Sequence, residues 1–440
     1  MKRLFYLVFV VFAFAIIFNY RCQLFGWGCP PVPPVNVVRK TFVVTMPESA
    51  DSIGFKSWLE SKGLINKHIA CPCSNGTQLW DGDINFHPDH DPPNMFLGAN
   101  VASNDTILFE KSPEIANITR KNPTKGTPIR IAIVDTGIDT LNKELKSFLY
   151  RNPVKTYFCN TNTFEGRYGM NMLYVSRQEQ QVEPIDRSGH GTFINGIVAG
   201  YAQFPPYSNQ QDADLGTPIK LLNVKIGDRL KIEGIVINTG TLFDAICGLH
   251  YAIEKKSMLI NASWGVKPKP DNVNSAGRAF LTALDKVQKD NITLIASAGN
   301  DGEKNIMIFP AAFATPITLT GGRITQFDYS KNVISVGSWN TNTVINSIAD
   351  HSNQGENVNL YAPGADIISF GLSSSTFPAS GTSFATPFVT RRLARILDNR
   401  MRNRTNTNNN VLSGLKIELM RQPNTTQIGD YKVLTMPDNS

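Results

Sequence analysis

Three segments far apart in the chain each carry a side chain that could serve in nucleophilic catalysis. Asp135 follows the apolar run 129–134, His190 stands at the start of an expected helix, and Ser383 opens another apolar helix. A serine hydroxyl is a poor nucleophile near neutral pH unless an imidazole accepts its proton, and a carboxylate must hold that imidazole in the right tautomer. The three residue types together predict acyl transfer through Ser383, with His190 as general base and acid, oriented by Asp135.

Each of these residues also has an ordinary structural explanation when it is taken alone. An aspartate after a strand often forms a turn, and a histidine on a surface is common. A serine at a helix start is often an N-cap, and Pro387 is expected within the first turn of that helix. The chemical prediction therefore depends on finding all three in one chain.

Six ordered segments resemble blocks of the subtilisin-like serine proteases, also called subtilases or peptidase family S8. They are Asp135-Thr136-Gly137, His190-Gly191-Thr192, Ser263-Trp264-Gly265, Ala298-Gly299-Asn300, Ala362-Pro363-Gly364 and Gly381-Thr382-Ser383. The chain order Asp, His, Ser is that of subtilisin and differs from the orders in chymotrypsin and the α/β-hydrolases. The resemblance covers roughly residues 126–398 and implies a serine-type endopeptidase with a protein or peptide substrate.

The resemblance also implies roles for residues around the three catalytic candidates. Asn300 is expected to donate its amide to the oxyanion of the reaction, together with the backbone N–H of Ser383. The substrate is expected to lie along Ser263, Trp264, Gly265, Ala298 and Gly299, where a glycine lets a peptide add as a strand.

Two stretches depart from the family's usual pattern. Phe193-Ile194-Asn195-Gly196 follows the histidine block where the family often has His-Val-Ala-Gly, and Phe384 and Phe388 stand where methionine and histidine are usual. These changes leave every catalytic group in place and bear on substrate preference.

Alternating strand-like and helical segments predict how these residues are positioned. The expected strands are 129–134, 220–226, 258–262, 292–296 and 333–336, and the expected helices are 191–202, 242–256 and 276–289, the last with Ser275 as its N-cap. This order predicts an α/β fold with a doubly wound, mostly parallel sheet and helices on both faces. Asp135 would lie at the carboxyl edge of the sheet, where such folds place functional groups.

The rest of the chain is expected to divide into three further parts. Lys2 and Arg3 precede the apolar run 4–18, so residues 1–21 are predicted to be a signal peptide or a membrane anchor. A Pro-rich linker and a small α+β segment follow over 22–125, with strands at 41–45 and 106–109 and a helix at 55–62. That segment is either a removable propeptide or an accessory domain that stays attached. A polar loop and a C-terminal tail are expected over 399–440.

Charge and cysteine content bear on partners and compartment. The 43 Lys and Arg against 36 Asp and Glu form no block of like charge, so no nucleic-acid partner is predicted, and the arginines between 391 and 404 are expected on a solvated helix face. The six cysteines fit an oxidising compartment and leave 15 pairings open. Cys71-Pro72-Cys73 is interpreted as disulfide or loop cysteines rather than a metal site, which would need a second ligand pair.

These features predict an exported protein, either secreted or membrane-anchored, with the peptidase domain outside. No cofactor is expected to be required. The resemblance also implies a structural calcium ion, which Asp139 or other loop carboxylates could hold, but the metal stays unassigned because no ligand pattern supports it. An esterase is disfavoured because no G-x-S-x-G surrounds Ser383, and a non-catalytic surface or assembly scaffold with the same fold remains the alternative.

Overall fold

The structure is a computed structural model that describes residues 39–46, 52–74, 77–83, 100–103, 106–109, 121–153, 156–159, 161–177, 180–204, 214–232, 235–320, 325–342, 346–403 and 411–435. The chain divides into the compact units Met1–Arg39 and Lys40–Ser440, and nearly all described residues belong to the second. The predicted signal peptide or membrane anchor and most of the linker lie outside the described ranges. Within those ranges, no helix combines the length and apolar character that crossing a bilayer requires.

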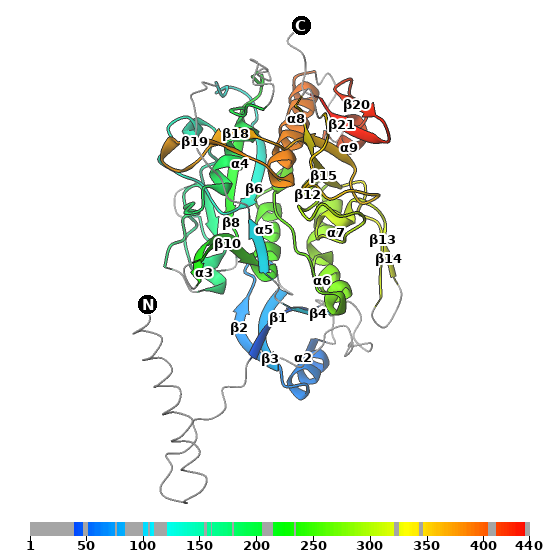
Figure 1. The fold of residues 1–440 in the computed structure, drawn as a ribbon. Helices are drawn as coiled ribbons and strands as arrows, with labels where there is room; N and C mark the ends of the chain where they lie inside the picture. The colour runs from blue at the N-terminus through cyan, green and yellow to red at the C-terminus, as the bar shows by residue number, and fades with distance from the viewer. Residues whose placement is uncertain are drawn as a thin grey trace, which may run out of the picture. The chain divides into compact units, whose positions relative to one another are not determined.

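A ten-stranded sheet forms the centre of the second unit (Figure 1). Its order is β20-β21-β17-β15-β12-β11-β6-β8-β7, with β16 paired to β15. The bounds are β6 Ile129–Asp135, β7 Gly169–Asn171, β8 Ile219–Lys225, β11 Leu259–Ala262, β12 Thr293–Ser297, β15 Val333–Asn340, β16 Ser347–Ile348, β17 Leu360–Pro363, β20 Thr425–Ile428 and β21 Tyr431–Leu434. All neighbours from β7 to β21 run parallel, and only β20 and β16 pair antiparallel. The predicted fold class is confirmed.

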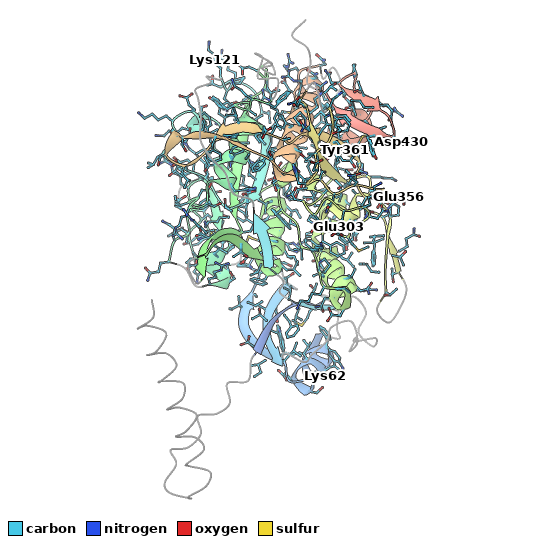
Figure 2. The ribbon with its side chains drawn as sticks, in the orientation of Figure 1. Lys62, Lys121, Glu303, Glu356, Tyr361 and Asp430 are labelled. Atoms are coloured by element: carbon cyan, nitrogen blue, oxygen red, sulfur yellow. A yellow bond between two sulfur atoms is a disulfide. The ribbon has the colours of Figure 1, made fainter. Side chains whose placement is uncertain are left out.

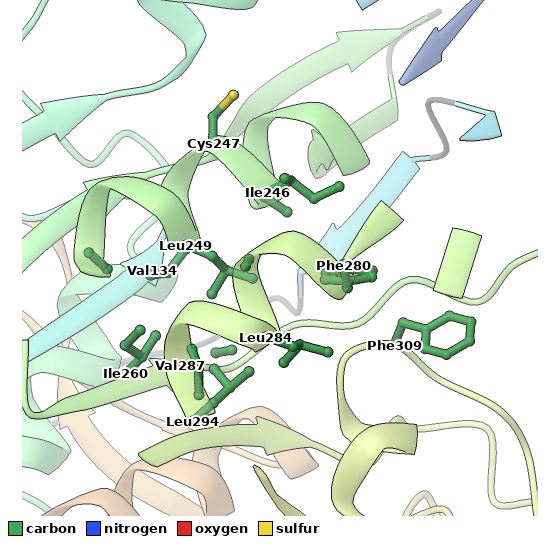
Figure 3. Close-up of a cluster of buried hydrophobic side chains, with 14 of the residues drawn as sticks. Val134, Ile246, Cys247, Leu249, Ile260, Phe280, Leu284, Val287, Leu294 and Phe309 are labelled. Atoms are coloured by element: carbon green, nitrogen blue, oxygen red, sulfur yellow. The ribbon is translucent and has the colours of Figure 1, made fainter. Parts of the chain in front are cut away.

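Alternation along the strands explains why helices cover both faces. Ile131 and Ile133 pack with α4 (His190–Ala199) and α8 (Thr382–Arg402). Ala132 and Val134 pack instead with α5 (Leu242–Glu254), α6 (Val273–Ala279) and α7 (Leu281–Lys289), as Figure 3 shows for part of that cluster. Successive side chains of a strand point to opposite faces, so a continuously apolar strand needs cover on both.

The chain changes direction across the sheet at β6. From β6 it passes through α4 to β8 on one side, and from β8 it returns through α5 to β11 on the other side. In open α/β sheets, the carboxyl ends of the strands at such a switch point hold the ligand. The end of β6 is Asp135.

The predicted helix 276–289 is wrong at its start. The structure has two helices, α6 and α7, which meet at Phe280, and Ser275 lies inside α6 rather than at its N-cap. Pro270 opens a short 3-10 helix, Pro270–Asn272, that leads into α6, and the Ser275 hydroxyl donates to the Asn272 carbonyl. Proline suits a first helical position, so the helical conformation begins earlier than the apolar periodicity indicates.

The arginine-rich part of α8 also differs from the prediction. Arg391 is 3% exposed, and its guanidinium donates to the Val198 carbonyl near the end of α4. This residue joins two helices instead of facing solvent.

The segment after residue 410 contributes to the central sheet. It forms α9 (Leu415–Leu419) and the β20–β21 hairpin, and β21 pairs with β17. Tyr361 of β17 lies 5.4 Å, ring to ring, from Tyr431 of β21, and Figure 2 shows Tyr361 close to the hairpin. The predicted boundaries at 398 and elsewhere stay predictions, although α8 continues past that position.

Residues before the central sheet form what we call the N-terminal module, which consists of β1 (Arg39–Thr45), α2 (Ser52–Ser61), β2 (Ile65–Ala70), β3 (Thr77–Asp83) and β4 (Asn100–Ser103). Its sheet has the order β2-β3-β1-β4. Phe42 and Val44 pack with Phe55 of α2, whereas Val43 and Leu79 belong to the core cluster that contains α5. β4 lies against α6 (Figure 1). One face of the module's sheet is thus buried against the helices of the central domain.

The described cysteines connect the same two parts. Cys73 of the module forms a disulfide with Cys159, 86 residues further along. Cys71 and Cys247 are buried thiols, while Cys22 and Cys29 lie outside the described residues. The disulfide interpretation of Cys71-Pro72-Cys73 is therefore correct for Cys73.

A further, three-stranded sheet pairs another N-terminal strand with the central domain. Its order is β5-β10-β9, from β5 (Thr106–Phe109), β10 (Ile235–Thr241) and β9 (Gly227–Ile232). β5 runs antiparallel to β10, with Phe109 opposite Asn238 and Thr106 opposite Thr241.

The stability of this fold should depend on the protonation of His250. The ring is buried between α5 and α7, Nε2 is bonded to Thr282, and Nδ1 has no partner among the described residues. Burial, together with the charge of Lys286, lowers the pKa of His250 to about 3. Below the ordinary value near 6.5 only the unfolded chain takes up the proton. Stability should therefore fall as pH drops from 6.5 towards 3, by at most about 1.4 kcal/mol per pH unit from this residue.

Urea unfolding at pH 7 and pH 4.5 measures this effect. His250→Gln keeps a side chain that can bond Thr282 but does not titrate, so the variant should lose less stability between the two pH values than the parent. Equal losses in both proteins would contradict a buried neutral imidazole.

Candidate active site

The carboxylate predicted to orient the imidazole is completely buried and does contact it. Asp135 Oδ1 lies 2.7 Å from His190 Nδ1 and also accepts the Thr136 backbone N–H at 2.7 Å. A carboxylate can only accept, so the proton of a neutral imidazole must sit on Nδ1. Nε2 is then the basic nitrogen, which is the tautomer that a general base requires.

Two glycines let helix α4 begin at His190. Gly189 precedes the helix with a φ of 92°, a conformation that other residues rarely adopt. A Cβ on Gly191 would lie 2.3 Å from the Gly137 carbonyl oxygen. The helix start therefore presses against the turn that follows β6, which brings His190 to Asp135.

Asp186 fixes this helix start, and the sequence analysis missed it. Its Oδ1 accepts the backbone N–H groups of Ser188 and Gly189, each at 2.9 Å. Its Oδ2 accepts the backbone N–H of Thr192 at 2.8 Å and the Thr192 hydroxyl at 2.7 Å. A carboxylate at the first turn of a helix satisfies N–H groups that lack helical partners. An aspartate four residues before the histidine was the available signal.

The predicted nucleophile begins the other helix of this face. Ser383 is the second residue of α8 and is 4% exposed. The ring of the next residue, Phe384, lies 5.4 Å from the His190 ring and 4.7 Å from that of Phe193. The serine segment and the Asp135–His190 pair thus meet at the carboxyl edge of the sheet. The catalytic roles of all three stay predictions.

Pro387 explains an unexpected position of Ser263. Pro387 is the sixth residue of α8, so the prediction that it lies in the first turn is wrong. Proline has no N–H to donate to the carbonyl four residues earlier, which is that of Ser383. The Ser263 hydroxyl donates to this carbonyl instead, at 2.7 Å. The side chain of Ser263, a residue predicted to line the substrate, thus holds the backbone of Ser383, the predicted nucleophile.

Thr382 orients the predicted oxyanion donor. Asn300 Oδ1 accepts both the backbone N–H of Thr382 at 2.8 Å and its hydroxyl at 2.9 Å. Because the backbone group can only donate, the atom facing it must be the amide oxygen, and the NH₂ group lies on the other branch. The Asn300 residue is exposed. Thr382 also accepts the Gly299 N–H at 3.2 Å, a bridging role that its place beside Ser383 in the motif could have suggested.

The side chain of Asn353 fixes the loop that carries Asn300. Gly299 has a φ of 99°, and a Cβ there would lie 2.5 Å from the Asn353 amide nitrogen. That amide donates to the Ala298 carbonyl at 3.0 Å, and its oxygen accepts the Asp301 N–H at 3.0 Å. Ala298 and Gly299 therefore have fixed backbones.

Two predicted substrate residues remain, Trp264 and Gly265, and neither has a side chain that could reach a substrate. Trp264 is 1% exposed, and its indole donates to the Val134 carbonyl at 2.9 Å. A Cβ on Gly265 would lie 2.3 Å from Ile308 Cγ2. A role of these residues in substrate binding stays a prediction and would have to use their backbone.

The Asp139 carboxylate accepts hydrogen bonds from two backbone N–H groups. Its Oδ1 accepts the Leu141 N–H at 2.9 Å and its Oδ2 the Ser373 N–H at 2.7 Å. Among the described residues, no group of three or more His, Cys, Asp and Glu side chains is arranged to hold a metal ion. The calcium suggestion stays untested.

A carboxylate–imidazole pair beside a serine at a helix start, on a doubly wound sheet, is the arrangement of a serine-type peptidase. Residues 126–422 match the sequence model of Peptidase_S8, the Subtilase family. The chain belongs to this family, as predicted.

Curated relatives agree with this family. The chain is 28% identical over 286 residues to the cell wall-associated protease of Bacillus subtilis (strain 168), covering 65% of this chain and 25% of the relative. It is 27% identical over 276 residues to the major intracellular serine protease of the same organism, covering 62% and 69%. Two Plasmodium falciparum relatives named subtilisin-like protease 2 are spanned to only 16% of their length.

The epidermin leader peptide processing serine protease of Staphylococcus aureus has a similar fold. Its structure matches with a TM-score of 0.58 at 16% identity, covering 90% of this chain and 98% of that one. At this identity the match supports the fold alone.

The bridging hydroxyl of Thr382 should matter for turnover. Thr382→Val keeps the shape but removes the hydroxyl that joins Asn300 to Gly299, so kcat on a peptide substrate should fall about tenfold, the effect of one hydrogen bond worth about 1.4 kcal/mol. KM should change little. Thr382→Ser keeps the hydroxyl and should retain most of the kcat. A serine variant as impaired as the valine variant would contradict this role.

Proposed function

We propose that the protein is a serine endopeptidase that hydrolyses peptide bonds through an acyl-enzyme on Ser383. The observation that carries the proposal is the buried 2.7 Å contact between Asp135 and His190 at the edge of the sheet where Ser383 begins α8. Buried carboxylate–imidazole pairs that leave Nε2 basic are suited to activating a hydroxyl.

The reaction would use these groups in sequence. His190 Nε2 takes the proton of the Ser383 hydroxyl while Oγ attacks the scissile carbonyl carbon, and the imidazolium then gives that proton to the leaving amine. Water hydrolyses the acyl-enzyme by the reverse sequence. Asp135 stays ionised throughout and stabilises the imidazolium. No cofactor takes part, and any calcium ion would be structural.

The negative charge on the carbonyl oxygen would be met by Asn300 and by the backbone N–H of Ser383. Two observations support this assignment: Thr382 fixes the amide oxygen of Asn300, and the residue is exposed to an incoming substrate. Donors fixed before the reaction need no reorganisation as charge develops.

We further propose a protein or peptide substrate that lies along the backbone of Ser263, Trp264 and Gly265 and of Ala298 and Gly299. The fixed loops around these residues support it, because an extended peptide adds to a rigid strand through its main chain. Export by the N-terminal apolar segment, leaving the peptidase domain outside, belongs to the same proposal, and the disulfide between Cys73 and Cys159 fits an oxidising compartment.

The chain is also proposed to be made as a zymogen, with residues 36–120 in the place of a propeptide. Strand β5 supports this because it pairs antiparallel with β10 near the site. A Cβ on Gly240 of β10 would lie 2.1 Å from the Ile226 carbonyl oxygen, and the Ile226 N–H donates to the Asp135 carbonyl at 2.7 Å. β5 therefore adds a strand beside the carboxyl edge that carries Asp135, as a bound peptide would.

A fluorophosphonate probe tests the proposal most simply. The mature protein should be labelled, and Ser383→Ala and His190→Ala should each abolish labelling and nearly all hydrolysis. Their effects on kcat should not add in the double variant, because the two residues act as one unit. Absence of labelling in folded, mature protein would favour the non-catalytic scaffold instead.

Replacing the oxyanion donor should affect the chemical step. Asn300→Ala should lower kcat by roughly 10²–10³, a magnitude known from subtilisin itself, and should change KM far less. Steady-state kinetics on one peptide substrate separates the two parameters. A change mainly in KM would mean that the amide does not face the transition state.

A further inference from the structure

The loop between β2 and β3 presents two cysteines to the central domain. Cys73 is already bonded to Cys159. Cys71, two residues earlier, is 2% exposed, and its backbone is fixed by a bond from its N–H to the Thr77 carbonyl at 2.8 Å. The loop therefore holds its second thiol in a set position on the same side of the interface.

The partner of that second thiol is Cys247 of helix α5. Cys71 neighbours the Cys247 thiol, and both residues lie in the core cluster where Val43 and Leu79 of the N-terminal module pack with α5. Cys247 is 1% exposed. Figure 3 shows its side chain directed away from Leu249 of the same helix and from Ile260 of strand β11. The outer side of α5 thus offers one thiol to the module.

The four described cysteines are arranged as two pairs. Each cysteine of Cys71-Pro72-Cys73 faces one cysteine of the central domain, so the four described cysteines make two pairs that both cross the same interface. Two neighbouring thiols that are buried inside a protein folding in an oxidising compartment are expected to be joined.

We propose that Cys71 and Cys247 form a second disulfide, so that two covalent bridges hold the N-terminal module on the central domain even after the chain between them is cut. The proposed zymogen would then be activated by the cut alone, and the module would stay attached as a subunit instead of leaving as a released propeptide. Of the two alternatives that the sequence allows, attachment is the one favoured.

The chemistry of closure is simple to balance. The two thiols lose two protons and two electrons as the S–S bond forms, and an oxidised disulfide of a thiol-exchange protein or of glutathione accepts them and is reduced to two thiols. Burial and the neighbouring Cys71 raise the pKa of Cys247 well above its ordinary value. Since the thiolate is the reactive form, closure is expected while the module docks, before Cys247 is buried.

The test uses the full chain with Ser383→Ala, so its outcome does not depend on the proposed protease activity. Residues 113–119 are replaced by the recognition sequence of a site-specific endoprotease, and the protein is folded in a glutathione redox buffer, then cut, denatured and alkylated. Without reductant the two fragments should migrate as one species, and with reductant as two.

Matched cysteine variants separate the bridges. Cys73→Ser/Cys159→Ser should stay linked through Cys71 and Cys247, Cys71→Ser/Cys247→Ser should stay linked through the other bridge, and the fourfold serine variant should fall apart. Release of the module from the Cys73→Ser/Cys159→Ser variant without reductant would overturn the proposal.

Peptide mapping of the protein with all cysteines present covers the case in which that variant does not fold. Trypsin should give a three-peptide species that joins 68–111 to both 156–167 and 232–255, with a mass lower by two hydrogens for each bond. Recovery of 232–255 as an alkylated single peptide would equally overturn it.

Discussion

The site depends on a buried contact between a carboxylate and an imidazole. Asp135 and His190 are both excluded from water, and the 2.7 Å bond between them sets which ring nitrogen is basic. Burying such groups without partners is costly, so the surrounding structure must bring them together accurately. Gly191 does so by letting helix α4 approach the turn after β6, and Asp186 does so by accepting the Gly189 N–H just before that helix and the Thr192 N–H in its first turn.

The same logic extends to the serine helix. Because Pro387 has no N–H, the Ser383 carbonyl lacks its helical donor. Ser263, which directly follows β11, donates its hydroxyl to that carbonyl instead. Thr382 connects the helix to Asn300 and Gly299. Ser383, Asn300 and the loop of Ala298 and Gly299 are therefore linked through side chains outside the proposed catalytic set.

Much of this could be predicted from the sequence, because it depends on local pattern. Mostly apolar runs such as 129–134 indicate strands buried on both faces, and Asp135 directly follows one of them. Contacts between distant segments could not be predicted from the sequence. They are the hydrogen bond from Ser263 to the Ser383 carbonyl, the hydrogen bond from the buried Arg391 to the Val198 carbonyl, and the bonds from Asp186 to the start of α4. The predicted start of the helix at 276 was wrong for a related reason, because the 3-10 helix that opens at Pro270 leads into α6 before the apolar pattern begins.

A crystal structure of the protein after reaction with a fluorophosphonate would test the central claim most directly. The account predicts phosphorus bonded to Ser383 Oγ, with its oxygen within hydrogen-bonding distance of Asn300 Nδ2 and the Ser383 backbone N–H, and with the Asp135–His190 contact intact. An adduct on another residue, or a phosphoryl oxygen directed away from Asn300 with His190 out of reach of Ser383, would contradict it.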